Sequence, residues 1–189
     1  RENNSFGVTT LQKKHIKVIK NNVVIDFNGK KNIRNTCKIK NKKIIRTLRE
    51  KRRSLNNDDN IFTYRIADKY HKINSKDVND YLKKFGDFSA KNFRTWGANI
   101  EFIYLVLKSC RKEFPRTKNE IKRTLNNCIK KVSHKLHNTT SVCKSNYLDP
   151  ELINLLEDNP KKFIELFNMN NLKKDKLITK YIEFLKSLI

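Results

Sequence analysis

The sequence predicts an α+β protein that is mostly α, with a small antiparallel β-meander at the N-terminus followed by a helical body. Three observations lead to this prediction. Short runs of β-branched residues, separated by turn-forming residues, occupy the first forty positions. From Asn41 on, apolar residues recur at helical spacing and helix-capping residues appear at intervals. The 189 residues have the length of one domain, so we expect a single domain over 1–189, with a β-rich lobe at 1–40 and a helical body at 41–189.

The strands are predicted from runs in which β-branched residues predominate. The predicted strands cover residues 8–11, 15–19, 23–27 and 35–39. Asn28-Gly29 follows the third run directly. This pair is typical of a two-residue hairpin turn, because both residues tolerate positive φ. We therefore expect these strands to pair as a small antiparallel meander.

The helices are predicted from apolar spacing and from their caps. A helix with a dense basic face is expected over 42–53, and a polar loop over 56–60. Further helices are expected to start at Ser75, at Ser89, at the capping box Thr117-x-x-Glu120 and at Asp149-Pro150. Gly86 is expected to end the helix that starts at Ser75. Two terminal helices are expected around 163–167 and 177–189.

The composition favours a polyanionic partner. Lys and Arg number 43 against 19 Asp and Glu, which gives a formal net charge of +24. An A+T-rich genome raises the Lys and Asn content, but it does not explain the excess of Lys over Glu, so we expect a nucleic-acid partner. No apolar run reaches about 18 residues, which excludes a predicted membrane-spanning helix. The four cysteines form no Cys-x-x-Cys pair and indicate reduced thiols in an intracellular protein.

Two short segments carry most of the chemical information. Residues 93–99 place Arg94 at the start of an apolar helix, and residues 138–147 end in Tyr147 after a basic stretch that contains histidine. A phenol has a pKa of about 10, so roughly one molecule in a thousand is ionised at neutral pH, a deficit of roughly 4 kcal/mol. Neighbouring cations reduce this cost and neutralise charge on a reacting phosphate. The pattern indicates a tyrosine oxygen nucleophile that attacks a phosphate.

Four segments follow one another along the chain. They are Glu2-Asn3-x-Ser5-x-Gly7-x-Thr9-Thr10-Leu11, Phe27-x-Gly29-Lys30, Phe93-Arg94-Thr95-Trp96-Gly97-x-Asn99 and the run from Asn138 to Tyr147. In this order they resemble the type IB DNA topoisomerases of poxviruses, bacteria and giant viruses, over nearly the whole chain. The resemblance implies that family's C-terminal catalytic domain, with the fold that it shares with tyrosine recombinases. It also implies a monomer that relaxes supercoiled duplex DNA through a 3′-phosphotyrosyl intermediate, without ATP, metal or another cofactor.

The resemblance also assigns roles by position. Tyr147 resembles the nucleophile, and Arg94 resembles an arginine that clamps the scissile phosphate with its bidentate fork. Lys30 resembles the general acid that protonates the 5′-oxygen. Asn138 stands where poxvirus enzymes carry His and many bacterial enzymes carry Asn, and it would donate a hydrogen bond to the phosphate. His137 stands where bacterial relatives usually have Gly, and it could either perturb the loop or add a second donor.

Further basic residues are candidates for DNA contacts. These are Lys144, Arg46, Arg49, Arg52 and Arg53. The alternative for the arginines is a solvated helix face. The family has a further catalytic arginine upstream of the Glu-Asn-x-Ser segment, and Arg1 does not occupy its position. We therefore expect that arginine and an N-terminal DNA-clamping lobe to be absent from this chain.

Two other functions are compatible with parts of the pattern. A tyrosine recombinase would share the chemistry, but no His-x-x-Arg box is found, and residues 95–99 after Arg94 favour the topoisomerase. A non-catalytic basic DNA-binding module would share the charge. His134, His137 and Cys143 lack a fourth ligand at a suitable spacing, so we expect no zinc site. We expect the protein to be intracellular, wherever its DNA lies.

Overall fold

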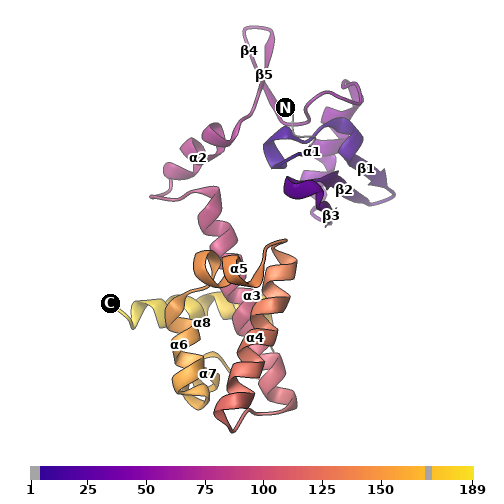
Figure 1. Cartoon of the computed structure of the whole chain (residues 1–189). Coiled ribbons are helices and arrows are strands. Elements are labelled where there is room, and N and C mark those ends of the chain that lie inside the picture. The colour runs from indigo at the N-terminus through magenta and orange to yellow at the C-terminus, as the bar shows by residue number, and fades with distance from the viewer. Residues whose placement is uncertain (1–4, 169–171) are drawn as a thin grey trace. The chain divides into compact units, whose positions relative to one another are not determined.

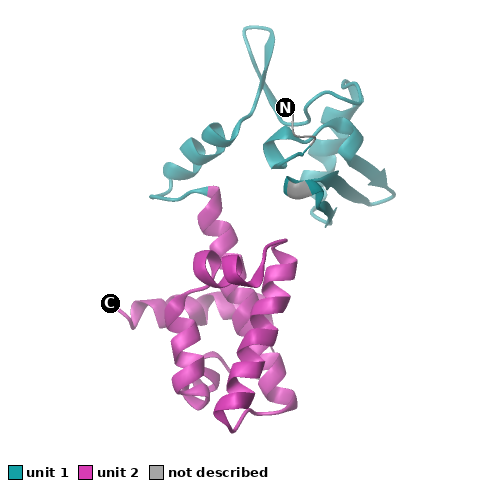
Figure 2. Cartoon of the chain, viewed as in Figure 1, with its two compact units in different colours: residues 1–89 teal, residues 90–189 magenta. Residues whose placement is uncertain are grey.

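The computed structural model describes residues 5–168 and 172–189 and divides into two compact units, Arg1–Ser89 and Ala90–Ile189 (Figure 2). Arg1, Glu2 and Asn3 lie outside the described residues. The β-rich lobe predicted at 1–40 lies within the first unit, where the helix after the sheet buries Ile45 and Leu48 in the same hydrophobic core as the strands.

The first unit is built on a three-stranded antiparallel sheet. Strands β1 (Ile16–Ile19), β2 (Asn22–Asn28) and β3 (Arg34–Ile39) lie in sequence order in the sheet, and helix α1 (Lys42–Arg53) follows (Figure 1). The core of this unit consists of Leu11, Ile16, Val23, Ile45, Leu48 and Ile61. The predicted meander and the helix over 42–53 are therefore confirmed.

Two details of the predicted meander are wrong. Residues 8–10 form a 3₁₀ turn (Val8–Thr10) instead of a strand. The turn is closed because the Thr10 N–H donates to the Gly7 carbonyl and the Gly7 N–H donates to the Thr10 hydroxyl. Residues 29–33 join β2 to β3 and contain a second 3₁₀ turn, Lys30–Asn32, so the connection is no two-residue hairpin. The left-handed backbone lies at Asn32 (φ 57°) and at neither residue of the Asn28-Gly29 pair.

A second hairpin lies where the sequence predicted only helices. Strands β4 (Thr63–Ile66) and β5 (Lys69–Lys72) pair in antiparallel fashion. The two residues between them, Ala67 and Asp68, both have positive φ (43° and 63°). This is the backbone of a type I′ turn, formed without the Asn-Gly or Asp-Gly pair that would have predicted it.

Helix α2 (Ser75–Lys83) follows the hairpin. It is capped by Asn74, one residue before the predicted start, and the Asn74 side chain accepts hydrogen bonds from the N–H groups of Lys76 and Asp77. Gly86 follows the helix with φ 138°, as expected for a residue that ends it. None of the residues of α2 is buried in the structure.

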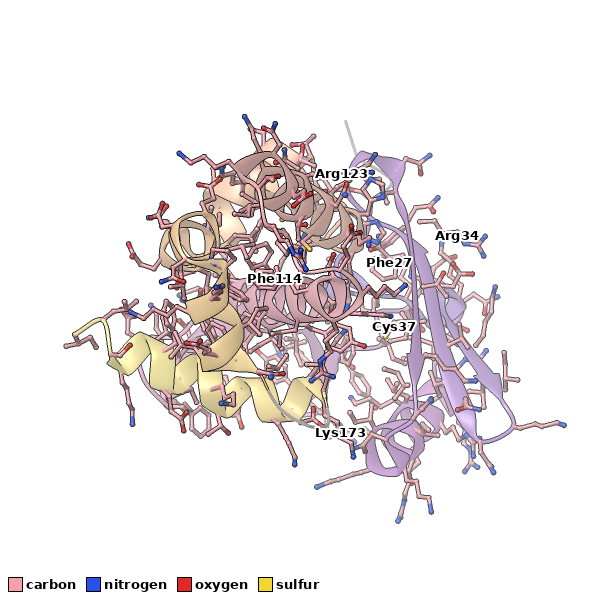
Figure 3. The ribbon with its side chains drawn as sticks, turned by 90° about the horizontal axis from the view of Figure 1, so that it is seen from below. Phe27, Arg34, Cys37, Phe114, Arg123 and Lys173 are labelled. Atoms are coloured by element: carbon pink, nitrogen blue, oxygen red, sulfur yellow. The ribbon has the colours of Figure 1, made fainter. Side chains whose placement is uncertain are left out.

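The second unit consists of helices. They are α3 (Ala90–Lys112), α4 (Lys118–Lys135), α5 (Thr140–Tyr147), α6 (Pro150–Asp158), α7 (Pro160–Phe167) and α8 (Lys174–Lys186). Helix α3 supplies many of the buried side chains of this unit. Figure 3 draws the side chains and labels Phe114, which is half-buried and packs against this core. The starts predicted at Ser89, at the Thr117 capping box and at Asp149 are confirmed. Among the residues that the structure describes, no helix has the length and apolar character needed to cross a bilayer.

The segment before Tyr147 is a helix, α5, which the sequence pattern did not predict. Thr139 caps α5 by accepting a hydrogen bond from the Val142 N–H (3.2 Å). Cys143 is fully buried and anchors α5 in the core of the unit. Only one of the eight side chains of α5 is buried, so the helix has no apolar stripe. The sequence therefore shows no 3.6-residue apolar periodicity that would predict it.

Candidate active site

Arg94 lies in the first turns of α3 and contacts two other parts of the second unit. Its Nη2 atom donates a hydrogen bond to the carbonyl oxygen of Leu136. Its Cζ atom lies 5.1 Å from the centroid of the Tyr147 ring, within the range of a cation–π contact. The side chain is exposed, so its remaining N–H groups can reach an anion.

Asn138 is positioned by the way in which α4 ends. His137 has a left-handed backbone (φ 52°), its N–H donates to the His134 carbonyl, and the Asn138 N–H donates to the Ser133 carbonyl (2.9 Å). This pair of bonds is the Schellman pattern, in which the left-handed position is usually Gly. The left-handed backbone explains why Gly would be favoured at position 137, as it is in the bacterial relatives that the resemblance points to.

One carbonyl group links these two candidate phosphate ligands. The Nδ2 atom of Asn138 donates to the Leu136 carbonyl oxygen (3.3 Å), which is also the acceptor for Arg94. Arg94 is therefore held against the residues that precede α5, while its guanidinium lies over the ring at the end of that helix. The structure thus brings Arg94, Asn138 and Tyr147 together within the second unit.

Tyr147 is the last residue of α5. Its ring is half-buried and packs against the core, and its hydroxyl makes no hydrogen bond with the described residues. The helix ends where the Leu148 N–H donates to the Cys143 carbonyl (3.2 Å). Burial raises the pKa of the Cys143 thiol, and the nearby charge of Arg94 lowers it by less. Cys143 thus behaves as a small apolar residue in the core.

Asn99 is the residue of this site whose role the sequence did not predict. It is 1% exposed, and its Nδ2 atom donates to the carbonyl oxygens of Thr95 (3.1 Å) and Tyr147 (3.3 Å). Its Oδ1 atom accepts from the Asp149 N–H (2.9 Å). Asn99 therefore joins α3 to both sides of the turn between α5 and α6. The sequence signal was its place at the end of the Phe93–Asn99 segment, in an otherwise apolar helix face.

Lys30 belongs to the first unit. It begins the 3₁₀ turn after β2, in a loop that is closed by the Gly29 N–H bonding to the Ile33 carbonyl (2.8 Å). A Cβ atom at Gly29 would lie 2.6 Å from Nδ2 of Asn35, so a larger residue here would require the Asn35 side chain to move. The Lys30 side chain is exposed and makes no hydrogen bond or ion pair with the described residues.

The predicted DNA-binding arginines lie on α1. Arg46, Arg49 and Arg53 line an open groove of about 580 Å³. Arg46 is paired with Glu50 (2.8 Å) and Arg49 donates to the Lys20 carbonyl. Arg52 is half-buried and does not line this groove. The face is therefore basic, but its arginines differ in how freely they can reach a ligand.

The other candidates lie on or near α5. Lys144 is exposed and lines a groove of about 370 Å³ with Lys130 of α4. His137 is exposed at the end of α4, beside Asn138. Within residues 5–168 and 172–189, no group of three or more His, Cys, Asp or Glu side chains could hold a metal ion.

The sequence as a whole is similar to known topoisomerases. The profile of the eukaryotic DNA topoisomerase I catalytic core matches residues 1–174. DNA topoisomerase 1B of Acanthamoeba polyphaga mimivirus is 31% identical over 172 residues, which cover 87% of this chain and 51% of that protein. DNA topoisomerase I of Monkeypox virus and DNA topoisomerase 1B of Vaccinia virus (strain Copenhagen) are each 23% identical over 190 residues, 99% of this chain and 55% of theirs.

A small antiparallel sheet followed by helices is consistent with the fold of this family. The chain belongs to the type IB DNA topoisomerase family. It spans about half the length of the curated relatives that it matches. The predicted α+β fold of that family is confirmed.

Proposed function

We propose that the full-length protein relaxes supercoiled duplex DNA by cutting one strand transiently and resealing it. The observation that carries this proposal is the cluster of Arg94, Asn138 and Tyr147, two of which share the Leu136 carbonyl as acceptor. Membership of the type IB family supports the same assignment. The net charge of +24 supports duplex DNA as the partner.

The proposed reaction is a reversible transesterification. The Tyr147 oxygen, after losing its proton to solvent, attacks the scissile phosphorus. The bond from phosphorus to the 5′-oxygen breaks, and that oxygen takes a proton from Lys30, which acts as general acid. The product is a 3′-phosphotyrosyl ester and a free 5′-hydroxyl. Because one phosphodiester is exchanged for another, the reverse reaction reseals the strand without a further energy source.

The remaining side chains stabilise the transferring phosphate. Arg94 supplies a planar fork for two non-bridging oxygens, and it already lies against the tyrosine ring. Asn138 supplies a neutral N–H donor, which can turn from the Leu136 carbonyl to the phosphate. His137 lies next to Asn138 and can supply a second donor. Fixed donors of this kind are worth most where charge develops in the transition state.

The test is a covalent-adduct assay with the full-length protein. End-labelled duplex DNA that carries a nick next to the cleavage site is incubated with the wild type and with Tyr147→Phe, in EDTA and without ATP. The products are separated on a denaturing gel. We expect a slowly migrating adduct with the wild type and none with Tyr147→Phe. Lys30→Ala is expected to slow adduct formation, whereas Lys31→Ala, its neighbour in the sequence, serves as the control.

Two further outcomes decide between the functions that share this chemistry or charge. Relaxation of a supercoiled plasmid without exchange of sites distinguishes a topoisomerase from a recombinase. Tight, salt-sensitive DNA binding by the full-length wild type with no adduct at all would overturn the proposal. That result would leave a non-catalytic DNA-binding module.

A further inference from the structure

Tyr181 of helix α8 is buried and contacts α3 and the turn that follows α5. Tyr181 is 3% exposed, and its hydroxyl donates a hydrogen bond to Oδ2 of Asp149 (3.0 Å). Its ring lies 4.9 Å from the Trp96 ring, at an angle of 49°. Trp96 is two residues after Arg94 on α3, and Asp149 is two residues after Tyr147. Tyr181 therefore contacts both segments that carry the candidate site.

A continuous set of hydrogen bonds leads from Tyr181 to the backbone of Tyr147. Asp149 caps α6 with Oδ1, which accepts from the Glu151 N–H (3.0 Å), while Oδ2 accepts from Tyr181. The Asp149 N–H donates to Asn99 Oδ1 (2.9 Å), and Asn99 Nδ2 donates to the Tyr147 carbonyl (3.3 Å). Every bond in this set involves a buried or half-buried group. Such networks hold their members in one arrangement because an unpaired buried group is costly.

Ion pairs also connect α8 to the end of α4, next to the Leu136 carbonyl that Arg94 and Asn138 bind. Lys174, the first residue of α8, pairs with Glu101 of α3, which also pairs with Lys135 at the end of α4. Lys135 directly precedes Leu136, the residue whose carbonyl accepts from Arg94 and Asn138. The match to the topoisomerase I catalytic core ends at residue 174, so nearly all of α8 lies beyond it.

Tyr181 is suited to a permanent donor role. Burial, the charge of Asp149 and the hydrogen bond to it all raise the pKa of the Tyr181 phenol far above its ordinary value. The hydroxyl therefore stays protonated at neutral pH. Its proton can be used only to hold the Asp149 carboxylate, because that carboxylate is its bonded partner.

We propose that Tyr181 is a positioning residue for the cleavage step, which fixes Asp149 and, through Asn99, the end of α5 that carries Tyr147. This inference rests on the proposed function of Tyr147 as nucleophile. Reacting groups must lie within about 0.5 Å of the productive geometry, and a displacement of roughly 1 Å reduces the rate strongly. Removing the Tyr181 hydroxyl therefore affects the chemical step rather than the binding of DNA.

The test compares Tyr181→Phe with Phe184→Leu in the full-length protein. Phe184 lies one turn further along α8, packs against Phe167 and stacks on the Tyr181 ring, so its truncation removes an apolar contact of Tyr181 but leaves the Tyr181 hydroxyl bonded to Asp149. We measure thermal unfolding, the dissociation constant for duplex DNA and the rate constant of adduct formation in a single turnover at saturating protein. Tyr181→Phe is expected to slow adduct formation roughly fivefold, with an unchanged dissociation constant. Phe184→Leu is expected to unfold at a lower temperature and to form the adduct at the wild-type rate.

A double-mutant cycle with Asn99→Ala tests whether Tyr181 acts on Tyr147 through Asn99. If the effect passes through Asn99, Tyr181→Phe adds no further slowing in the Asn99→Ala background. The proposal is overturned if Tyr181→Phe reacts at the wild-type rate, or if Phe184→Leu slows the reaction as much. Absence of an adduct in the wild type would instead refute the proposed function, so the two failures are distinguishable.

Discussion

Arg94 contacts both the Leu136 carbonyl and the Tyr147 ring. A substitution at Arg94 therefore changes the contacts of the proposed nucleophile. Lysine keeps the charge of Arg94 but lacks the planar fork that can bind two oxygens. We expect Arg94→Ala to slow adduct formation by about 100- to 1,000-fold at saturating protein, and Arg94→Lys to recover only a small part of this loss. Arg123→Ala, which removes an exposed arginine of α4, is the control and should react normally. A fully active Arg94→Lys would show that charge alone suffices.

His137 combines a left-handed backbone with a side chain that carries a Cβ atom. Glycine adopts this conformation without the clash between Cβ and the carbonyl oxygen. We expect His137→Gly to raise the free energy of unfolding by about 0.5–1 kcal/mol, measured by urea titration. His137→Ala removes the imidazole but keeps Cβ, so it should bring no such gain. Equal stability of the two variants would mean that the backbone at this position is unstrained.

The residues of the site differ in how far the sequence could predict them. Tyr147 and Arg94 stood out because a tyrosine and an arginine in short polar segments of a basic chain match a phosphate chemistry, whereas Asn138 was assigned only by the family resemblance. The role of Asn99 could not be predicted, because it depends on two backbone groups of the α5–α6 turn meeting α3. Likewise, nothing in the sequence pairs Tyr181 with Asp149, thirty-two residues earlier.

Glu101 connects three helices through its ion pairs with Lys135 and Lys174. Burial alone would raise the pKa of Glu101, but the bonds to the two lysines outweigh burial and lower it. A lowered pKa in the folded state means that the stabilisation is fully present above the unfolded pKa, about 4.3, and is lost as the pH falls through the folded value. The contribution of this side chain is therefore acid-sensitive.

The variant Glu101→Gln should show this acid sensitivity in urea unfolding. It should be less stable than the wild type at about pH 6, and the difference in free energy of unfolding should shrink as the pH falls towards about 3. Glu157→Gln, on the exposed surface of α6, controls for the loss of one negative charge. A difference that stays constant across this range would show that the Glu101 carboxylate is not linked to folding.

Among the helices and strands, the capped helices were predictable and the β4–β5 hairpin was not. The helix starts at Thr117 and Asp149 can be read from the local sequence, because each side chain accepts a hydrogen bond from an N–H group within three residues. The hairpin over 63–72 places Ala67 and Asp68 at positive φ, which neither residue signals strongly. Helix α5 was missed because its burial comes from packing on other helices through Cys143 rather than from an apolar stripe.

For the whole molecule, the net charge of +24 predicts salt-sensitive DNA binding. Removing one side chain that neutralises a phosphate should reduce the slope of log K against log salt by about 0.9. We expect Arg46→Gln/Arg53→Gln, which changes two arginines of the α1 groove, to weaken binding and flatten this slope. Lys161→Gln/Lys162→Gln on α7 removes the same charge and is the control. If both pairs behave alike, the effect is one of net charge and α1 has no special role.

If Tyr147 is the nucleophile, it becomes joined covalently to the 3′ end of the broken strand. Mass spectrometry of the trapped adduct, after digestion with trypsin and nuclease, identifies the residue that carries the DNA. We expect the peptide containing Tyr147 to carry a nucleotide bound through its 3′-phosphate, and the other DNA fragment to end in a 5′-hydroxyl. A nucleotide on another residue, or a link through a 5′-phosphate, would contradict the proposed chemistry.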